Sequence, residues 1–363
     1  MSHRIAQALR NPDRAVRSLW QRSFRPLTAE RDMERFVRRF NQGSTSAPFI
    51  LYVAPQFDYG DCRRGYGFEE NNFLDSLVHS GYRVTAFDQV SCTRAVGKPN
   101  MNKILLELVY REEPSLLFMV MFKDEIAFNT LDKIREVIGV PTLNWFCDDH
   151  WRFGSFSRIY APHLSWSVTT DPVAVEKYRE IGVSNVLLSQ WACNTHLYHP
   201  LSVPQIQDAS FVGQPHGNRP EVIHAVRRSG VEVVAYGFGW PSGRVSLSEM
   251  VAVFCQTRIN LNLSNASTGG EQQIKGRDFE IPGCGAFMLT ARTAGVDTYF
   301  LPDQEIVCYD SLADLIEKVH YYLEHNEERE KVAQAGYERV IREHTYRHRF
   351  DVIFSRVLDG TGR

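Results

Sequence analysis

The feature that most constrains the fold is an alternation of short apolar, β-rich runs with amphipathic stretches that end at a glycine. The run 116–122 contains only apolar residues, and Gly81, Gly139 and Gly182 each follow an amphipathic stretch. Fully apolar strands that alternate with helices are typical of parallel sheets covered on both faces. The alternation therefore predicts an α/β protein.

The alternation occurs twice, and the two series predict two domains. We expect strands at 48–53, 83–87, 116–122, 142–147, 165–169 and 185–188, and then at 209–212, 231–236, 258–263, 286–289 and 306–309. The segment 196–204 contains two prolines and is a plausible linker. A chain of 363 residues, 43% of them hydrophobic, is long enough for two cores.

We therefore predict two Rossmann-like domains that face each other across a cleft. The first covers residues 46–200, the second covers 207–343, and a C-terminal helix at 344–363 returns to the first. In open α/β sheets a ligand binds beyond the carboxyl ends of the strands, so we expect the functional groups there.

Residues 1–40 differ from the rest of the chain. They hold ten arginines, no lysine and four acidic residues. Apolar residues recur there at roughly helical intervals, at Ile5, Leu9, Val16, Leu19, Trp20 and Phe24. We predict a basic helical extension over 1–45. It could make peripheral contact with anionic lipid or a partner, or it could be a solvated or domain-packed extension.

Composition excludes several classes of protein. The net charge of −2 argues against a nucleic-acid partner, and no apolar run is long enough to span a membrane. The first residues lack the apolar core of a signal peptide. Seven scattered cysteines without a CxxC pair predict reduced thiols and no zinc site. These features predict a cytoplasmic protein without a metal or other cofactor, and leave membrane association through residues 1–40 open.

The segment 275–285 carries the strongest functional signal. Lys275 and Arg277 precede Glu280 by five and three residues, in an expected helix that ends at a glycine. The upstream loop 267–270 could open that helix, and the first N–H groups of a helix attract phosphate. The two cations could neutralise a diphosphate, while Glu280 could accept hydrogen bonds from a ribose diol. The alternative is an i,i+3 salt bridge between Arg277 and Glu280.

The ends of three other expected strands supply compatible groups. After the strand 209–212, Gly213 would let the backbone approach a diphosphate, and Arg219 could reach the same group. The alternative is an ordinary turn with a surface arginine. A nucleotide base could pack against the Gly-Phe-Gly sequence at 237–239. The predicted donor-binding residues are Gly213, Arg219, Gly237, Gly239, Asn262, Lys275, Arg277 and Glu280.

The first half of the chain should hold the acceptor. Asp148, Asp149 and His150 follow the strand 142–147, and a carboxylate or imidazole there could deprotonate an acceptor hydroxyl. The alternatives are a helix N-cap with a surface histidine, and a site for a metal such as Mn²⁺. Asp124 is a second-choice base, and the glycine-rich loop 59–67 is a candidate acceptor loop.

The stretch 274–287 resembles the signature of GT-B-fold glycosyltransferases of the CgeB (spore maturation protein)-like, or group 1, type. The resemblance spans most of 209–350 and continues more loosely through 145–149 and 168–171. It implies a nucleotide-sugar donor bound by the C-terminal domain. In the wider group of retaining enzymes two glutamates occur eight residues apart and the second binds the ribose. Glu280 matches the second, whereas Gln272 stands at the first.

The resemblance implies a metal-independent glycosyltransferase that moves a sugar from a nucleotide to an acceptor hydroxyl, with retention as one stereochemical course. The acceptor could be a sugar, a lipid-linked molecule, a protein or a small molecule. Two alternatives remain. One is a metal-dependent transferase that uses Asp148, Asp149 and His150. The other is a non-catalytic scaffold that binds a nucleotide sugar.

Overall fold

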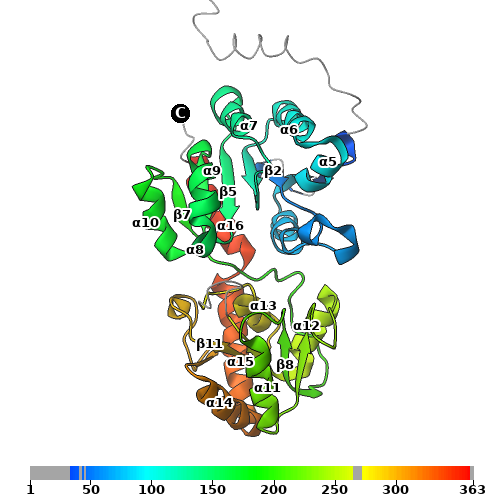
Figure 1. The fold of residues 1–363 in the computed structure, drawn as a ribbon, viewed down its shortest axis with the longest axis vertical. Coiled ribbons are helices and arrows are strands. Elements are labelled where there is room, and N and C mark those ends of the chain that lie inside the picture. Colours follow the sequence, from blue (N-terminus) through cyan, green and yellow to red (C-terminus); the bar gives the residue numbers. More distant parts are fainter. Residues whose placement is uncertain (1–32, 41–42, 45, 265–271, 360–363) are drawn as a thin grey trace, which may run out of the picture. The chain divides into compact units, whose positions relative to one another are not determined.

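The computed structural model describes residues 33–40, 43–44, 46–264 and 272–359. Its contacts divide the chain into two units (Figure 1). Unit 1 comprises residues 1–189 and 350–363, and unit 2 comprises residues 190–349. Each unit is built on its own mainly parallel sheet, so the predicted α/β class with two Rossmann-like domains is confirmed.

Among the described residues, unit 1 contains a seven-stranded sheet in the order β1-β3-β2-β4-β5-β6-β7. Only β1 runs antiparallel to its neighbour; the other pairs are parallel. Its strands are β1 (Val37–Phe40), β2 (Phe49–Val53), β3 (Arg83–Phe87), β4 (Leu116–Met119), β5 (Thr142–Phe146), β6 (Trp166–Thr169) and β7 (Val186–Leu188). Every residue of β4 and β5 is buried, as expected for a sheet with both faces covered.

Helices connect these strands. They are α4 (Asp75–His79), α5 (Gln89–Val96), α6 (Lys98–Glu112), α7 (Phe128–Asp132), α8 (Asp149–Arg152), α9 (Arg158–Tyr160) and α10 (Pro172–Glu180). Single turns of 3₁₀- or π-helix lie between them: η1 (Asp58–Gly60), η2 (Cys62–Arg64), η3 (Glu69–Leu74), η4 (Lys133–Ile138), η5 (Phe153–Ser157) and η6 (Ala161–His163). The chain returns to unit 1 through α16 (Tyr346–Asp359). Phe350 of α16 packs edge-on against Phe118 of β4, with ring centroids 5.9 Å apart.

Strand β1 corrects the predicted helical extension at its C-terminal end. Val37 faces the core at 7% exposure and pairs with Phe87 of β3. Arg38 points the other way and donates from Nη2 to Oε2 of Glu70 at 2.7 Å. This alternation has the period of a strand, and an open edge at β3 is available to pair with it. The apolar positions predicted between residues 5 and 24 lie outside the described residues, as does the loop 267–270.

Within its described residues, unit 2 has a five-stranded parallel sheet in the order β12-β11-β10-β8-β9. Its strands are β8 (Gln207–Val212), β9 (Val233–Tyr236), β10 (Thr257–Asn262), β11 (Met288–Ala291) and β12 (Val307–Tyr309). Its helices are α11 (Arg219–Arg228), α12 (Leu247–Gln256), α13 (Arg277–Gly283), η7 (Val296–Thr298), α14 (Leu312–Glu324) and α15 (Asn326–Glu343).

Local capping explains where two of these helices begin. The predicted N-cap Ser311 accepts a hydrogen bond from the backbone N–H of Asp314 and starts α14. Helix α12 was not among the expected elements, although Ser246 and Glu249 form a reciprocal capping box at its start. Throughout the part of the chain that the structure describes, no helix has the length and apolarity needed to cross a membrane.

Candidate functional site

Glycines allow two loops of unit 2 to pack against each other at the carboxyl ends of β8 and β9. Gly237 has φ of 140°, and a Cβ there would lie 2.3 Å from the carbonyl oxygen of Gly213. A Cβ on Gly239 would lie 2.9 Å from Cγ of Pro215. The indole Nε1 of Trp240 donates to the carbonyl oxygen of Gly213 at 2.8 Å. The predicted glycines therefore shape the loops by close backbone approach.

Arg219 fastens one of these loops to the neighbouring strand. Its side chain is buried, with Nη1 donating to the carbonyl oxygen of Gln214 at 2.9 Å and Nη2 to that of Leu263 at 2.8 Å. Burial lowers the pKa of Arg219, and the charge of Arg277 lowers it further. Arg219 is thus a buried cation at the ends of β8 and β10, unlike the surface arginine of the alternative interpretation.

Asp278, which the sequence analysis did not single out, fixes the start of α13. Its Oδ1 accepts from Nδ2 of Asn262 at 2.8 Å and from Oγ1 of Thr290 at 3.1 Å. Its Oδ2 accepts from the backbone N–H of Lys275 at 2.7 Å. Burial raises the pKa of Asp278 to about 6. The predicted donor residue Asn262 therefore orients Asp278, which holds the start of α13 over the ends of β10 and β11.

Arg277 and Glu280 form an ion pair within α13, which is the alternative that their i,i+3 spacing predicts. Nη1 of Arg277 donates to Oε2 of Glu280, whose side chain is fully buried. Burial disfavours the charged form of Arg277, but the charge of Glu280 raises its pKa overall. Among the described residues, Oε1 of Glu280 has no hydrogen-bond partner. A buried oxygen in that state can accept a hydrogen bond from a bound hydroxyl group.

Positive charge gathers around these residues. Burial lowers the pKa of His216, and the charges of Arg219 and Lys275 lower it further. The positive charge of Arg277 likewise lowers the pKa of Arg219. Three predicted cations and His216, which was not predicted, are thus brought together from the loop after β8, the start of α11 and the start of α13. Like charges held together in this way favour an anion.

In unit 1, Asp149 turns away from the surface. It is 1% exposed and accepts a hydrogen bond from the hydroxyl of Tyr178 at 2.9 Å. Burial raises the pKa of Asp149. The neighbouring residues Asp148 and His150 remain partly exposed. Across the described ranges, no group of three or more His, Cys, Asp or Glu side chains is placed to hold a metal ion.

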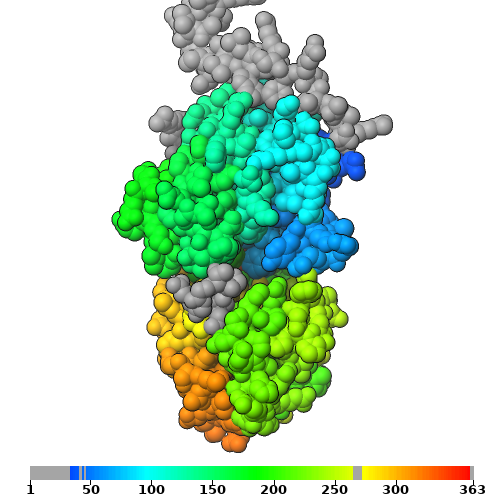
Figure 2. All heavy atoms as spheres, viewed as in Figure 1, coloured from blue at the N-terminus to red at the C-terminus, as the bar shows by residue number. Residues whose placement is uncertain are grey.

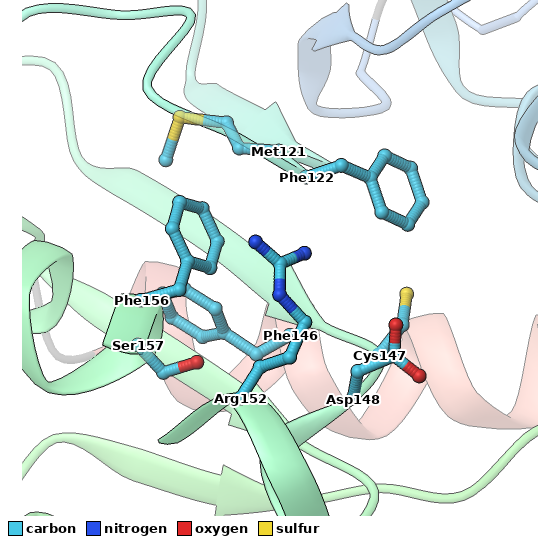
Figure 3. A pocket seen from close by; sticks show the side chains of 8 residues that line it. All are labelled: Met121, Phe122, Phe146, Cys147, Asp148, Arg152, Phe156 and Ser157. Atoms are coloured by element: carbon cyan, nitrogen blue, oxygen red, sulfur yellow. The ribbon is translucent and has the colours of Figure 1, made fainter. Parts of the chain in front are cut away.

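Asp148 lies at a small pocket beyond the carboxyl ends of β4 and β5 (Figure 3). The guanidinium of Arg152 points into this pocket toward Met121 and Phe122. Its Cζ also lies 4.7 Å from the ring centroid of Phe156. The cavity measures about 10 Å³, which is room for roughly one water molecule. The cavity is therefore too small to hold a sugar.

Glu69 is a second carboxylate near this edge, and the sequence analysis missed it. It begins η3, and its Oε2 would lie 3.0 Å from a Cβ placed on Gly67. Burial raises the pKa of Glu69 to about 7, and the negative charges of Asp58 and Asp148 add to the effect. The available signal was the pair of adjacent glutamates that form the first turn of this helix. The other, Glu70, is engaged by Arg38.

The remaining acceptor predictions lie on the surface of unit 1. Asp124 is 81% exposed and forms an ion pair with Nζ of Lys98 at 2.7 Å. The loop after β2, blue in Figure 2, exposes Tyr59 at 77% and Tyr66 at 57%. The ring of Tyr66 stacks on Phe57 at a centroid distance of 5.8 Å. Exposed aromatic rings at this edge could stack on a sugar.

Residues 219–355 match a family model described as glycosyl transferase-like. Sucrose-phosphate synthase from Thermosynechococcus elongatus superimposes with a TM-score of 0.61 at 9% identity, over 86% of this chain and 100% of that one. Anabaena HepE in complex with UDP-glucose gives 0.60 at 10% identity, over 86% and 99%. A glycosyltransferase from Rickettsia africae gives 0.59 at 11% identity, also over 86% and 99%. No sequence among the curated proteins matches this chain.

At these identities the structural likeness shows the fold, which is the GT-B fold of two Rossmann-like domains. The family match adds that residues 219–355, which lie in unit 2 and the following helix, are similar to the glycosyl transferase-like family.

Proposed function

We propose that this protein transfers a sugar from a nucleoside-diphosphate sugar to an acceptor hydroxyl, without a metal ion. The observation that carries the proposal is the gathering of Arg219, Lys275 and Arg277 at the carboxyl edge of the unit 2 sheet. Positive groups held at this edge can stabilise the charge that develops on a departing diphosphate. A uridine nucleotide is the first donor to test, because the structure of HepE holds UDP-glucose.

Within this proposal Glu280 binds the ribose. Its Oε2 is held by Arg277, so a hydrogen bond from a ribose hydroxyl to Oε1 would cost little side-chain freedom. Gly213, Gly237 and Gly239 shape the loops around the diphosphate and base. Asn262 acts at one remove, because it orients Asp278.

The acceptor binds on unit 1 in this proposal. Its hydroxyl oxygen forms a bond to the anomeric carbon while the bond from that carbon to the diphosphate breaks. The hydroxyl proton passes to a nearby base, for which we propose Asp148 or Glu69, with His150 as a third group. We assign Asp149 a positioning role, because it is held by Tyr178. Retention of configuration rests on the family resemblance and is decided by proton NMR of the product.

Titration calorimetry with UDP, GDP, CMP and TDP, each with and without EDTA, tests the donor site. We expect one nucleotide to bind with an affinity that EDTA leaves unchanged. Lys275→Ala should weaken this binding about tenfold or more, because a charge-assisted contact is lost. Lys331→Ala, on the exposed face of α15, is the matched control.

Release of free nucleotide from the matching nucleotide sugar then tests catalysis. Tight binding without any release or transfer would instead support the non-catalytic scaffold. Binding that requires Mn²⁺ would support the metal-dependent alternative. No binding of any nucleotide would overturn the proposed donor site.

A further inference from the structure

Two cysteine thiols lie together beside the helix that carries Arg277 and Glu280. Cys255 is near the end of α12, and Cys284 directly follows α13. The sulfur of Cys255 lies 3.6 Å from the carbonyl oxygen of Cys284 and 3.9 Å from that of His199. Both cysteines are free thiols in the structure.

The two thiols differ in access and in acidity. Cys284 is 2% exposed, whereas Cys255 is only half-buried and can meet a small solute. A hydrogen bond with the Cys284 thiol lowers the pKa of Cys255 to about 7. The same hydrogen bond, together with burial, raises the pKa of Cys284. One sulfur can therefore attack an oxidant from solvent, while its neighbour stays protonated and protected.

We propose that Cys255 and Cys284 form an oxidative modification site, at which a peroxide converts the two thiols to a disulfide. The thiolate of Cys255 attacks a peroxide oxygen, so that an S–O bond forms and the O–O bond breaks; hydroxide leaves and takes up a proton to become water. Cys284 then attacks the resulting sulfenic acid. The S–S bond forms, the S–O bond breaks and a second water leaves with the Cys284 proton.

The site is connected to α13 through tightly packed backbone. The N–H of Cys284 donates to the carbonyl oxygen of Glu280 at 3.2 Å. A Cβ on Gly283 would lie 2.3 Å from the sulfur of Cys193, so the helix end has little room to move. A disulfide at Cys284 would therefore shift the turn that holds Glu280. We expect weaker nucleotide binding in the oxidised form, a consequence that rests on the proposed function.

The test is titration of the purified full chain with hydrogen peroxide, followed by thiol counting and peptide mass mapping. We expect two of the seven thiols to be lost first, with a Cys255–Cys284 peptide lighter by two hydrogens and restored by dithiothreitol. In Cys284→Ser, Cys255 should be trapped by dimedone as its sulfenic acid. Cys255→Ser should remove the fast reaction, whereas Cys62→Ser, which changes an exposed cysteine, should leave it intact.

A first disulfide that joins any other pair, or thiol loss that is equally fast in Cys255→Ser, would overturn the proposal. Both outcomes are read from masses, so they stand apart from any failure of the proposed transferase function. UDP titration before and after oxidation is a separate readout. Unchanged affinity with a mapped Cys255–Cys284 disulfide would retain the modification site and refute its link to the donor site.

Discussion

The guanidinium of Arg277 and the carboxylate of Glu280 form an ion pair within α13, and the carboxylate is fully buried. A buried pair is costly to break from one side, because the remaining charge loses its partner. The same pair leaves one oxygen of Glu280 without a protein partner among the described residues. In the proposed function, this oxygen accepts a hydrogen bond from the ribose of the donor.

Arg277→Met should lower the free energy of unfolding by about 3 kcal/mol, since it leaves Glu280 buried and uncompensated. The double variant Arg277→Met with Glu280→Gln should recover much of this loss but should not bind nucleotide. Urea denaturation and UDP titration measure the two effects separately. Full UDP affinity in Glu280→Ala would exclude a ribose contact by this residue.

The two neighbouring aspartates should contribute to different properties: Asp149 to stability, through Tyr178, and Asp148 to the transfer rate. Tyr178→Phe removes the hydroxyl that donates to Asp149, so we expect a loss of about 1–3 kcal/mol of stability. Asp148→Asn, at the partly exposed neighbouring position, should change stability by less than about 0.5 kcal/mol and lower the transfer rate. If Asp148→Asn transfers sugar at the normal rate, Asp148 is not the base.

Stability should depend on pH through His344. Its Nε2 lies 2.6 Å from the carbonyl oxygen of Tyr299, and burial together with the charge of Arg349 lowers the pKa of His344 to about 4. Between pH 6.5 and 4 the unfolded chain therefore binds a proton that the folded chain does not. Stability should fall as the pH is lowered through this range, by about 3 kcal/mol from this group. In His344→Phe the pH dependence should be flatter; an identical slope would contradict the assignment.

The transfer rate should rise with pH through about 7 if Glu69 is the base, because its carboxylate becomes ionised over that range. Glu69→Gln should remove this rise and lower the plateau rate. Glu70→Gln is the matched control, since Glu70 is adjacent in sequence but binds Arg38. A rise that persists unchanged in Glu69→Gln would assign the base to another group.

Gly237→Ala should impair unit 2 more than a similar change elsewhere. The added methyl would lie 2.3 Å from the Gly213 oxygen, so backbone must move in both loops. Gly230→Ala is the matched control: its φ is also positive, but nothing lies within 4 Å of the added methyl. We expect a loss of about 1 kcal/mol from Gly230→Ala through backbone strain alone, and a larger loss, with weaker UDP binding, from Gly237→Ala. Equal losses by thermal denaturation would argue against close loop packing.

The sequence by itself determined the two-sheet architecture and the position of most strands. The run that forms β4 is apolar throughout, and Gly139, with a φ of 82°, ends η4. Both features can be read from residues that are close together in the sequence. The sequence also offered the Arg277–Glu280 pair as an alternative, because residues three apart on a helix are neighbours.

Tertiary structure decided which of the predicted polar groups are buried and what they contact. Asp148 and Asp149 are adjacent in sequence, yet only Asp149 meets Tyr178 of α10. Arg219 reaches Leu263 across 44 residues, and β1 exists because β3 offers it an edge. Burial of a side chain depends on elements far away in the sequence, so local pattern fixes the type of a residue's secondary structure but not its partners.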